Sequence, residues 1–197
     1  MPSGISKRVG LNGLVVAVEP DTGVWPFLHE NLERNNCKAY VVQGVLGRRS
    51  ANIVGGGYGA RSQYFDAPSE QRNHVSWREL QSATGVMFDT LLIDCEGCVH
   101  HIIPHVRHAL RSGQIKTILV EADMPEKGTG IGDRIVTGSD CSDDCADYGA
   151  FYKEIQRFGF ELVDEFNDCD TTRTHAPPGT WCGDFIWHYA FQLKRER

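Results

Sequence analysis

The chain has 197 residues, a formal net charge of −6 and 41% hydrophobic residues, a size and composition that suit one α/β domain with a sizeable core. No apolar run approaches the roughly 18 residues of a membrane span, and the first residues lack the apolar segment of a signal peptide. We therefore expect no membrane partner and, by default, a cytoplasmic protein. Because no basic tract stands out, we expect no nucleic-acid partner either.

Apolar runs of strand length alternate with helical patterns along the chain. We predict strands at 14–19, 39–43, 90–95, 116–122, 160–166 and 184–193. Helices are predicted at 23–35, 77–83, 97–110 and 151–158, and Pro104 is expected to kink the third or mark a turn in it. Residues 47–66 are predicted to form a hairpin or an irregular excursion. Residues 124–147 and 167–183 are predicted to be surface loops, and residues 1–13 to be disordered or a loop. This alternation predicts a single α/β domain with a mostly parallel sheet.

Acidic residues follow three of these predicted strands. Glu19 ends the first, Asp94 and Glu96 follow the run Thr90–Ile93, and Glu121 closes Ile118–Val120. In open α/β sheets the carboxyl ends of the strands form the edge where ligands bind. The sequence therefore predicts one crevice with an acidic rim.

Five motifs occur in order along the chain: VVAVEPD, NLERNN, YVVQGVLG, FDTLLIDCEG and IKTILVEADMP. Together they resemble the FkbM-type S-adenosylmethionine-dependent methyltransferases over residues 14–123, and more loosely over 150–193. The resemblance implies a Rossmann-like class I methyltransferase sheet whose final strand is antiparallel. It also implies O-methylation of a small-molecule or glycan hydroxyl, with S-adenosylmethionine as cofactor.

Residues at the first two strand ends match the cofactor-binding positions of that family. The resemblance implies that Glu19, followed by Pro20, grips the cofactor ribose, because a carboxylate can accept hydrogen bonds from two vicinal hydroxyls. It places Gln43 and Gly44 beside the adenine, where a glycine allows close approach of the ring. Two alternatives stay open, namely that Glu19 is a strand-end acid that caps the next helix and that Gly44 belongs to a plain turn.

Catalytic candidates lie near the third strand end. The resemblance places Asp94 and Glu96 near the methyl donor or the acceptor, with ordinary loop acids as the alternative. His74, close to Trp77 in the sequence, is a candidate general base for an acceptor hydroxyl.

The family's first strand and its D-x-G-x-x-x-G loop have no counterpart here, since only MPSGISKRVGLNG precedes residue 14. In the family this strand lies between those matched by 14–19 and 90–95. We therefore expect a domain truncated at its N-terminus that binds S-adenosylmethionine weakly or not at all and self-associates through an incomplete sheet. The alternative to an enzyme is a non-catalytic remnant of the fold that acts as a binding module.

Seven cysteines leave at least one unpaired within the chain. A zinc site with four thiolate ligands could be formed by four of the cysteines at positions 95, 98, 141, 145, 169 and 182. The interpretation that we adopt is free thiols, with Cys95 as a small buried residue. A disulfide in the region from Cys141 to Cys182 is a further possibility. Four histidines at 100, 101, 105 and 108 are interpreted as the solvated flank of a helix, so we predict no metal site.

Overall fold

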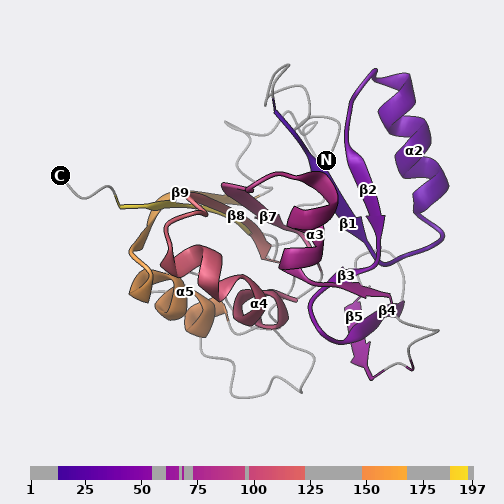
Figure 1. The fold of residues 1–197 in the computed structure, drawn as a ribbon. Coiled ribbons are helices and arrows are strands. Elements are labelled where there is room, and N and C mark those ends of the chain that lie inside the picture. The colour runs from indigo at the N-terminus through magenta and orange to yellow at the C-terminus, as the bar shows by residue number, and fades with distance from the viewer. Residues whose placement is uncertain are drawn as a thin grey trace, which may run out of the picture. The chain divides into compact units, whose positions relative to one another are not determined.

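The computed structural model of the protein describes residues 13–54, 61–66, 68, 73–95, 98–122, 148–167 and 187–194 (Figure 1). The chain forms two compact units. The first contains Met1–Gly55 and Gln63–Val86, and the second contains Gly56–Ser62 and Met87–Arg197.

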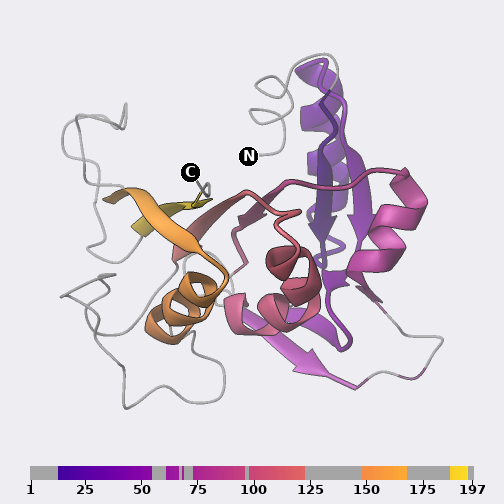
Figure 2. The same cartoon turned by 60° about the vertical axis from the view of Figure 1, so that its left-hand side comes forward.

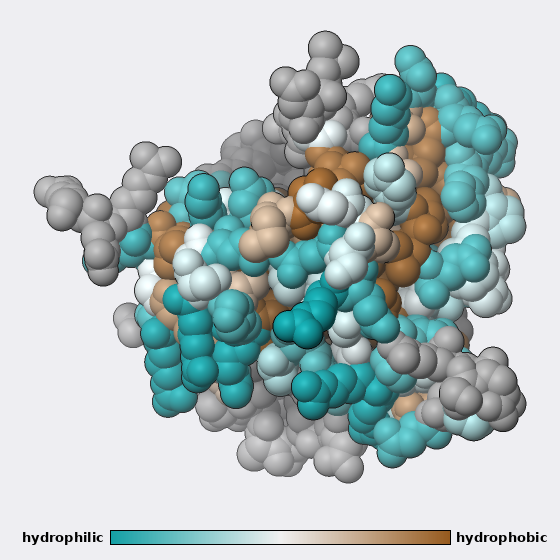
Figure 3. All heavy atoms as spheres, viewed as in Figure 1, coloured by the Kyte–Doolittle hydropathy of each residue, from teal (hydrophilic) through white to brown (hydrophobic). Residues whose placement is uncertain are grey.

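The first unit begins with a β-α-β segment. Strand β1 (Val16–Glu19) pairs in parallel with β2 (Tyr40–Gln43), and helix α2 (Trp25–Arg34) connects them. Figures 1 and 2 both show α2 running alongside this strand pair. Leu32 is buried while the opposite side of the helix is exposed, as expected for an amphipathic surface helix. Figure 3 accordingly shows hydrophobic residues along the strand pair and hydrophilic ones on the outer side of α2.

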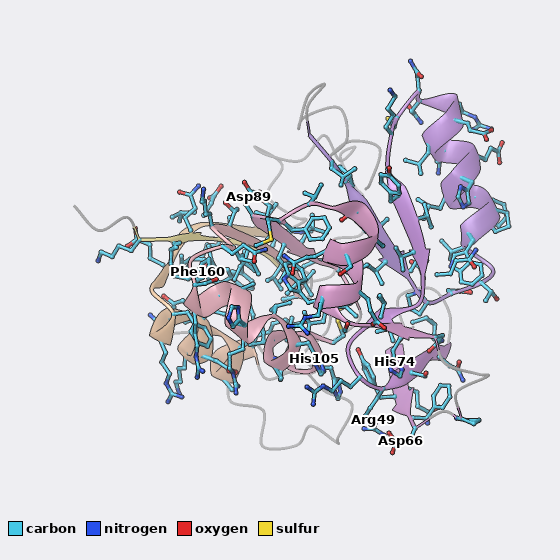
Figure 4. All side chains as sticks on the ribbon, in the orientation of Figure 1. Arg49, Asp66, His74, Asp89, His105 and Phe160 are labelled. Atoms are coloured by element: carbon cyan, nitrogen blue, oxygen red, sulfur yellow. A yellow bond between two sulfur atoms is a disulfide. The ribbon has the colours of Figure 1, made fainter. Side chains whose placement is uncertain are left out.

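The remainder of the first unit contains short strands and one helix. Strand β3 (Val45–Leu46) pairs in parallel with β6 (His74–Val75). Strand β4 (Ser50–Val54) pairs with β5 (Arg61–Phe65), of which the residues from Gln63 onward belong to this unit. Beside β4 and β5, Arg49 Nε lies 3.2 Å from Asp66 Oδ1 (Figure 4). Helix α3 (Trp77–Thr84) starts with a capping box formed by Ser76 and Glu79 and ends at Gly85 in the left-handed conformation.

The second unit is built on one mixed sheet in the order β7-β8-β10-β9. Strand β7 (Thr90–Ile93) is parallel to β8 (Thr117–Ala122). Strand β10 (Trp187–Leu193) is antiparallel to β8 and to β9 (Phe160–Asn167). Alternate residues of β8 are buried, among them Ile118 at 0% and Val120 at 2% exposure, so one face of the sheet carries the core.

Two helices cover that apolar face. Helix α4 (Val99–Arg111) and helix α5 (Tyr148–Arg157) lie together in Figures 1 and 2, and Arg107 on α4 forms an ion pair with Glu154 on α5. Their inward residues follow helical spacing, and the largest buried side chains of the unit come from both layers: Ile93, Val99, Ile103, Val106, Leu110, Ile118, Ile155 and Phe191.

Most of the predicted elements are confirmed, and so is the α/β class. Parallel pairing occurs in β1–β2 and in β7–β8, but in the described residues these pairs belong to two separate sheets and not to one mostly parallel sheet. The expected antiparallel final strand is present as β10, which runs against both of its neighbours. Helix α4 continues through the exposed Pro104, so no turn occurs there. The predicted loops 124–147 and 1–13 lie almost wholly outside the described residues, and 167–183 likewise. No helix in the described part of the chain is both long and apolar enough to cross a membrane.

The turn after β2 provides a test of this packing. Gly44 has φ +154°, and a Cβ atom there would lie 2.4 Å from the carbonyl oxygen of Asn73. Because backbone cannot rotate away as a side chain can, we expect Gly44→Ala to lower the free energy of unfolding by roughly 2–3 kcal/mol. Urea denaturation measures this. Gly85→Ala is the control, since its φ is +69° but nothing lies within 4 Å; an equal or larger loss at Gly85 would contradict the clash.

Candidate functional site

Four predicted cofactor-binding residues come together in the first unit, at the carboxyl ends of β1 and β2. Glu19 is paired with Gln43 in the parallel register, and the Gly44 amide donates to the Glu19 carbonyl at 2.9 Å. Pro20 follows directly, and Gln43 is exposed. The strand ends that the resemblance assigns to the cofactor therefore lie side by side, whereas Asp94 and Glu121, which were predicted to share one crevice with Glu19, belong to a different sheet.

The Glu19 side chain is tied to the turn that follows it. Its Oε1 accepts a hydrogen bond from the Asp21 amide at 2.7 Å, and the indole Nε1 of Trp25 donates to the Glu19 carbonyl at 2.9 Å. These bonds hold the turn between β1 and α2. Because Asp21 precedes both Trp25, the first residue of α2, and the N-cap Val24, this bond supports the turn and does not cap the helix. A carboxylate has further acceptor positions in addition to the one used here.

Gly44 has a structural reason to be a glycine. The backbone of Asn73 approaches it closely, and Asn73 is itself fixed because its side chain bonds both backbone groups of Ala51. The Ala51 amide donates to Asn73 Oδ1 at 3.0 Å, and Asn73 Nδ2 donates to the Ala51 carbonyl at 2.7 Å. Close approach by the chain's own backbone accounts for Gly44 without a ligand.

His74 lies on β6, half-buried, with Nδ1 3.4 Å from the hydroxyl of Ser50 (Figure 4). That hydroxyl accepts a bond from the Asn73 amide at 3.1 Å, and Ser50 is fully buried. His74 therefore belongs to a packed polar network within the first unit, and Ser50 is too deeply buried to meet a substrate.

The second unit contains a row of three titratable side chains across its sheet. Glu121 on β8 is directly paired with His188 on β10, and Asp94 follows Ile93, which is paired with Val120. Because Ile93, Val120 and Tyr189 are buried on the helix side, strand alternation directs Asp94, Glu121 and His188 to the opposite face. Oε2 of Glu121 lies 3.9 Å from His188 Nδ1, within ion-pair distance when the imidazole is protonated.

The surroundings of Asp94 raise the pKa of its carboxyl group. Although Asp94 as a whole residue is exposed, enough protein surrounds the carboxyl group that burial raises its pKa above the ordinary value, and His188 partly offsets this rise. The Glu121 and His188 side chains are 17% and 20% exposed, so both are shielded but reachable. The row can exchange protons and hold a hydroxylated or cationic ligand.

Asp94 and Glu121 were predicted from the sequence, whereas His188 was not. The one available signal was alternation, which places His188 opposite Tyr189 and Phe191 in the last strand. Its pairing with Glu121 depends on β10 lying beside β8, which local patterns do not reveal. Glu96, a predicted catalytic residue, lies outside the described residues.

The reading of Cys95 and Cys98 as free thiols is wrong, because they form a disulfide with an S–S distance of 2.00 Å. Cys37 is partly buried, and its Sγ lies 3.4 Å from the carbonyl oxygen of Asn35. Cys141 and Cys182 lie outside the described residues. Within the described ranges, no cluster of three or more His, Cys, Asp or Glu side chains is arranged to hold a metal ion.

The chain matches no protein-family model, no curated protein and no solved structure. Its function must therefore be argued from its own residues.

The raised pKa of Asp94 predicts a pH-dependent effect of its replacement. A carboxyl whose pKa is higher when folded favours the protonated form, so its stabilising contribution is complete at low pH and is lost as pH rises through the folded pKa. We expect Asp94→Asn, which mimics the protonated state, to raise the melting temperature slightly at pH 7. The gain should vanish below about pH 4, near the ordinary Asp pKa.

Thermal unfolding followed by circular dichroism from pH 3 to 8 makes this measurement. Asp89→Asn, at the exposed start of the same strand, is the matched control. A gain at Asp94 that is equal at all pH values would contradict the role of ionisation.

Proposed function

We propose that this protein is an S-adenosylmethionine-dependent methyltransferase that methylates a hydroxyl oxygen of a small molecule or glycan. One observation carries the proposal: the row of Asp94, Glu121 and His188 at the carboxyl ends of β7 and β8. Ligands bind at such strand ends in open α/β sheets. The row supplies a base and two acidic side chains at the edge of the sheet where the FkbM-type resemblance places the methyl donor and the methyl acceptor.

His188 is the proposed base. S-adenosylmethionine supplies an electrophilic methyl group, and the acceptor hydroxyl must lose its proton as the oxygen is methylated. An imidazole is suited to take that proton near neutral pH. Glu121 Oε2, 3.9 Å from His188 Nδ1, favours the imidazolium that results. His188 thus takes the role first given to His74, whose ring nitrogen lies beside the buried Ser50.

Asp94 is proposed to orient the acceptor. A carboxyl with a raised pKa can accept a hydrogen bond when ionised and donate one when protonated, and either bond suits a polyhydroxylated molecule. Positioning of the attacking oxygen contributes much of the rate of an in-line displacement.

Cofactor binding is assigned by resemblance to the first unit. The donor set fits, because the carboxylate of Glu19 offers oxygens to ribose hydroxyls and the exposed amide of Gln43 is next to it in the register. The antiparallel hairpin of β9 and β10 gives further support, since the resemblance implies a hairpin of this kind at the end of the domain.

Replacement of His188 tests the base. We expect His188→Gln to lower the rate of methyl transfer by about 10²–10⁴-fold, the usual contribution of a general base, while cofactor affinity changes little. Transfer from methyl-labelled S-adenosylmethionine to a panel of sugars, polyols and phenols is the measurement. His29→Gln on exposed α2 is the control. Equal activity of the two variants would contradict the role of His188.

Replacement of Glu19 tests cofactor binding. We expect Glu19→Ala to weaken binding by about 1–3 kcal/mol because charge-assisted hydrogen bonds are lost. Calorimetric titration with S-adenosylmethionine measures the change, and Glu33→Ala on the exposed side of α2 is the control. Unchanged affinity would remove Glu19 from the cofactor site. If the wild-type chain binds neither the cofactor nor its demethylated product, the binding-module alternative replaces the enzyme.

A further inference from the structure

The disulfide between Cys95 and Cys98 occupies a distinctive place in the second unit. It joins the end of β7 to the start of α4, so that the order along the chain is strand, Cys-x-x-Cys, helix. Cys98 is the N-cap residue of a helix of 13 residues. Neither the acid–imidazole row nor the proposed methyl transfer uses these sulfur atoms.

We propose that Cys95 and Cys98 form a redox-active pair that exchanges electrons with an external dithiol, with Cys95 as the attacked sulfur. The proposal does not depend on the proposed methyltransferase activity. Three observations support it: the position at a helix N-terminus, the unequal burial of the two cysteines, and the shortness of the ring that the disulfide closes.

The helix start favours a thiolate at Cys95. The backbone amides of a first helical turn have no partners within the helix and carry partial positive charge. Here the Cys98 amide points at Cys95 Sγ, with a nitrogen–sulfur distance of 3.2 Å. A hydrogen bond of this kind is stronger when its acceptor is charged, so reduction of the disulfide strengthens it. Cysteines at helix N-termini are correspondingly more acidic and more reactive.

Unequal burial decides which sulfur is attacked. Cys98 is 2% exposed, whereas Cys95 is only partly buried. An incoming thiolate therefore reaches Cys95, and Cys98 is the leaving group. This asymmetry separates the pair into an attacked and a resolving cysteine, as thiol–disulfide exchange requires.

Stabilisation of the fold does not by itself explain this disulfide well. The two cysteines are separated by three positions in the sequence, so the disulfide closes a very short loop. The chain entropy that a cross-link removes from the unfolded state grows with loop length, so this ring contributes less than a cross-link that closes a long loop.

The exchange proceeds in two balanced steps. A thiolate of the external dithiol attacks Cys95 Sγ, a bond forms between the partner and Cys95, and the bond to Cys98 breaks. The electron pair of that bond goes to Cys98 Sγ, which takes up a proton. The second thiolate of the partner then attacks the partner's sulfur in the mixed disulfide, the bond to Cys95 breaks, and its electron pair leaves with Cys95 Sγ as a thiolate. The partner leaves as a disulfide, having given two electrons to the pair, one proton to Cys98 and one proton to solvent.

The test uses the full chain and mass spectrometry that resolves each cysteine peptide. With dithiothreitol under native conditions, we expect complete reduction of the pair without loss of circular dichroism signal, and reoxidation by glutathione disulfide. In the reduced protein, iodoacetamide at pH 7 should label Cys95 at least tenfold faster than Cys98. Cys37→Ser is the matched control and should leave both results unchanged, because Cys37 is in the first unit.

Trapping provides a second measurement. Cys98→Ser should accumulate a glutathione mixed disulfide at Cys95, and Cys95→Ser should accumulate at least tenfold less at Cys98. If the disulfide is reduced only after the protein is unfolded in urea, it is a structural cross-link, and the proposal is overturned. Equal labelling of the two cysteines in the reduced wild-type protein would overturn it as well, even if a serine variant fails to fold.

Discussion

The register of β8 is the constraint on which the second unit depends. This strand pairs with β7 in parallel on one side and with β10 in antiparallel on the other. Because strand side chains alternate, the same register that buries Val120 between Ile93 and Tyr189 puts Glu121 beside His188 on the other face. A slip of one residue would exchange the two sets, burying charge and exposing the core. The apolar packing therefore also fixes the polar row.

A row of two acids and one imidazole is costly for a sheet surface unless the charges compensate each other. Burial of Asp94 disfavours its ionised form, and the nearby His188 favours it, so the two effects oppose one another. Ionisable groups whose surroundings have opposing effects on their pKa cluster at functional sites. For this reason we prefer the row to the His74 network as the candidate site.

The strands and helices were predictable because their signals are local. The alternation of Phe160–Asn167 and the apolar run of Thr90–Ile93 identify strands without reference to the rest of the chain. The two-residue strands β3 and β6 were missed, since neither is long enough to show a period. The order β7-β8-β10-β9 was also beyond reach, because pairing between distant segments leaves no mark in either one. For the same reason His188 was not predicted, because it becomes a site residue only through the pairing that places it beside Glu121.

The disulfide is another feature that could not be predicted from the sequence, although it lies within a segment of four residues. The spacing of Cys95 and Cys98 fits free thiols, zinc ligands and a cross-link equally, and the choice depends on the backbone between a strand end and a helix start. That junction also explains why the pair is uneven. Cys95 comes shortly after the end of β7 and is only partly buried, whereas Cys98, the N-cap residue of α4, is buried next to the fully buried Val99. The passage from strand to helix thus gives two chemically equal sulfur atoms different access to solvent, and exchange chemistry needs such a difference.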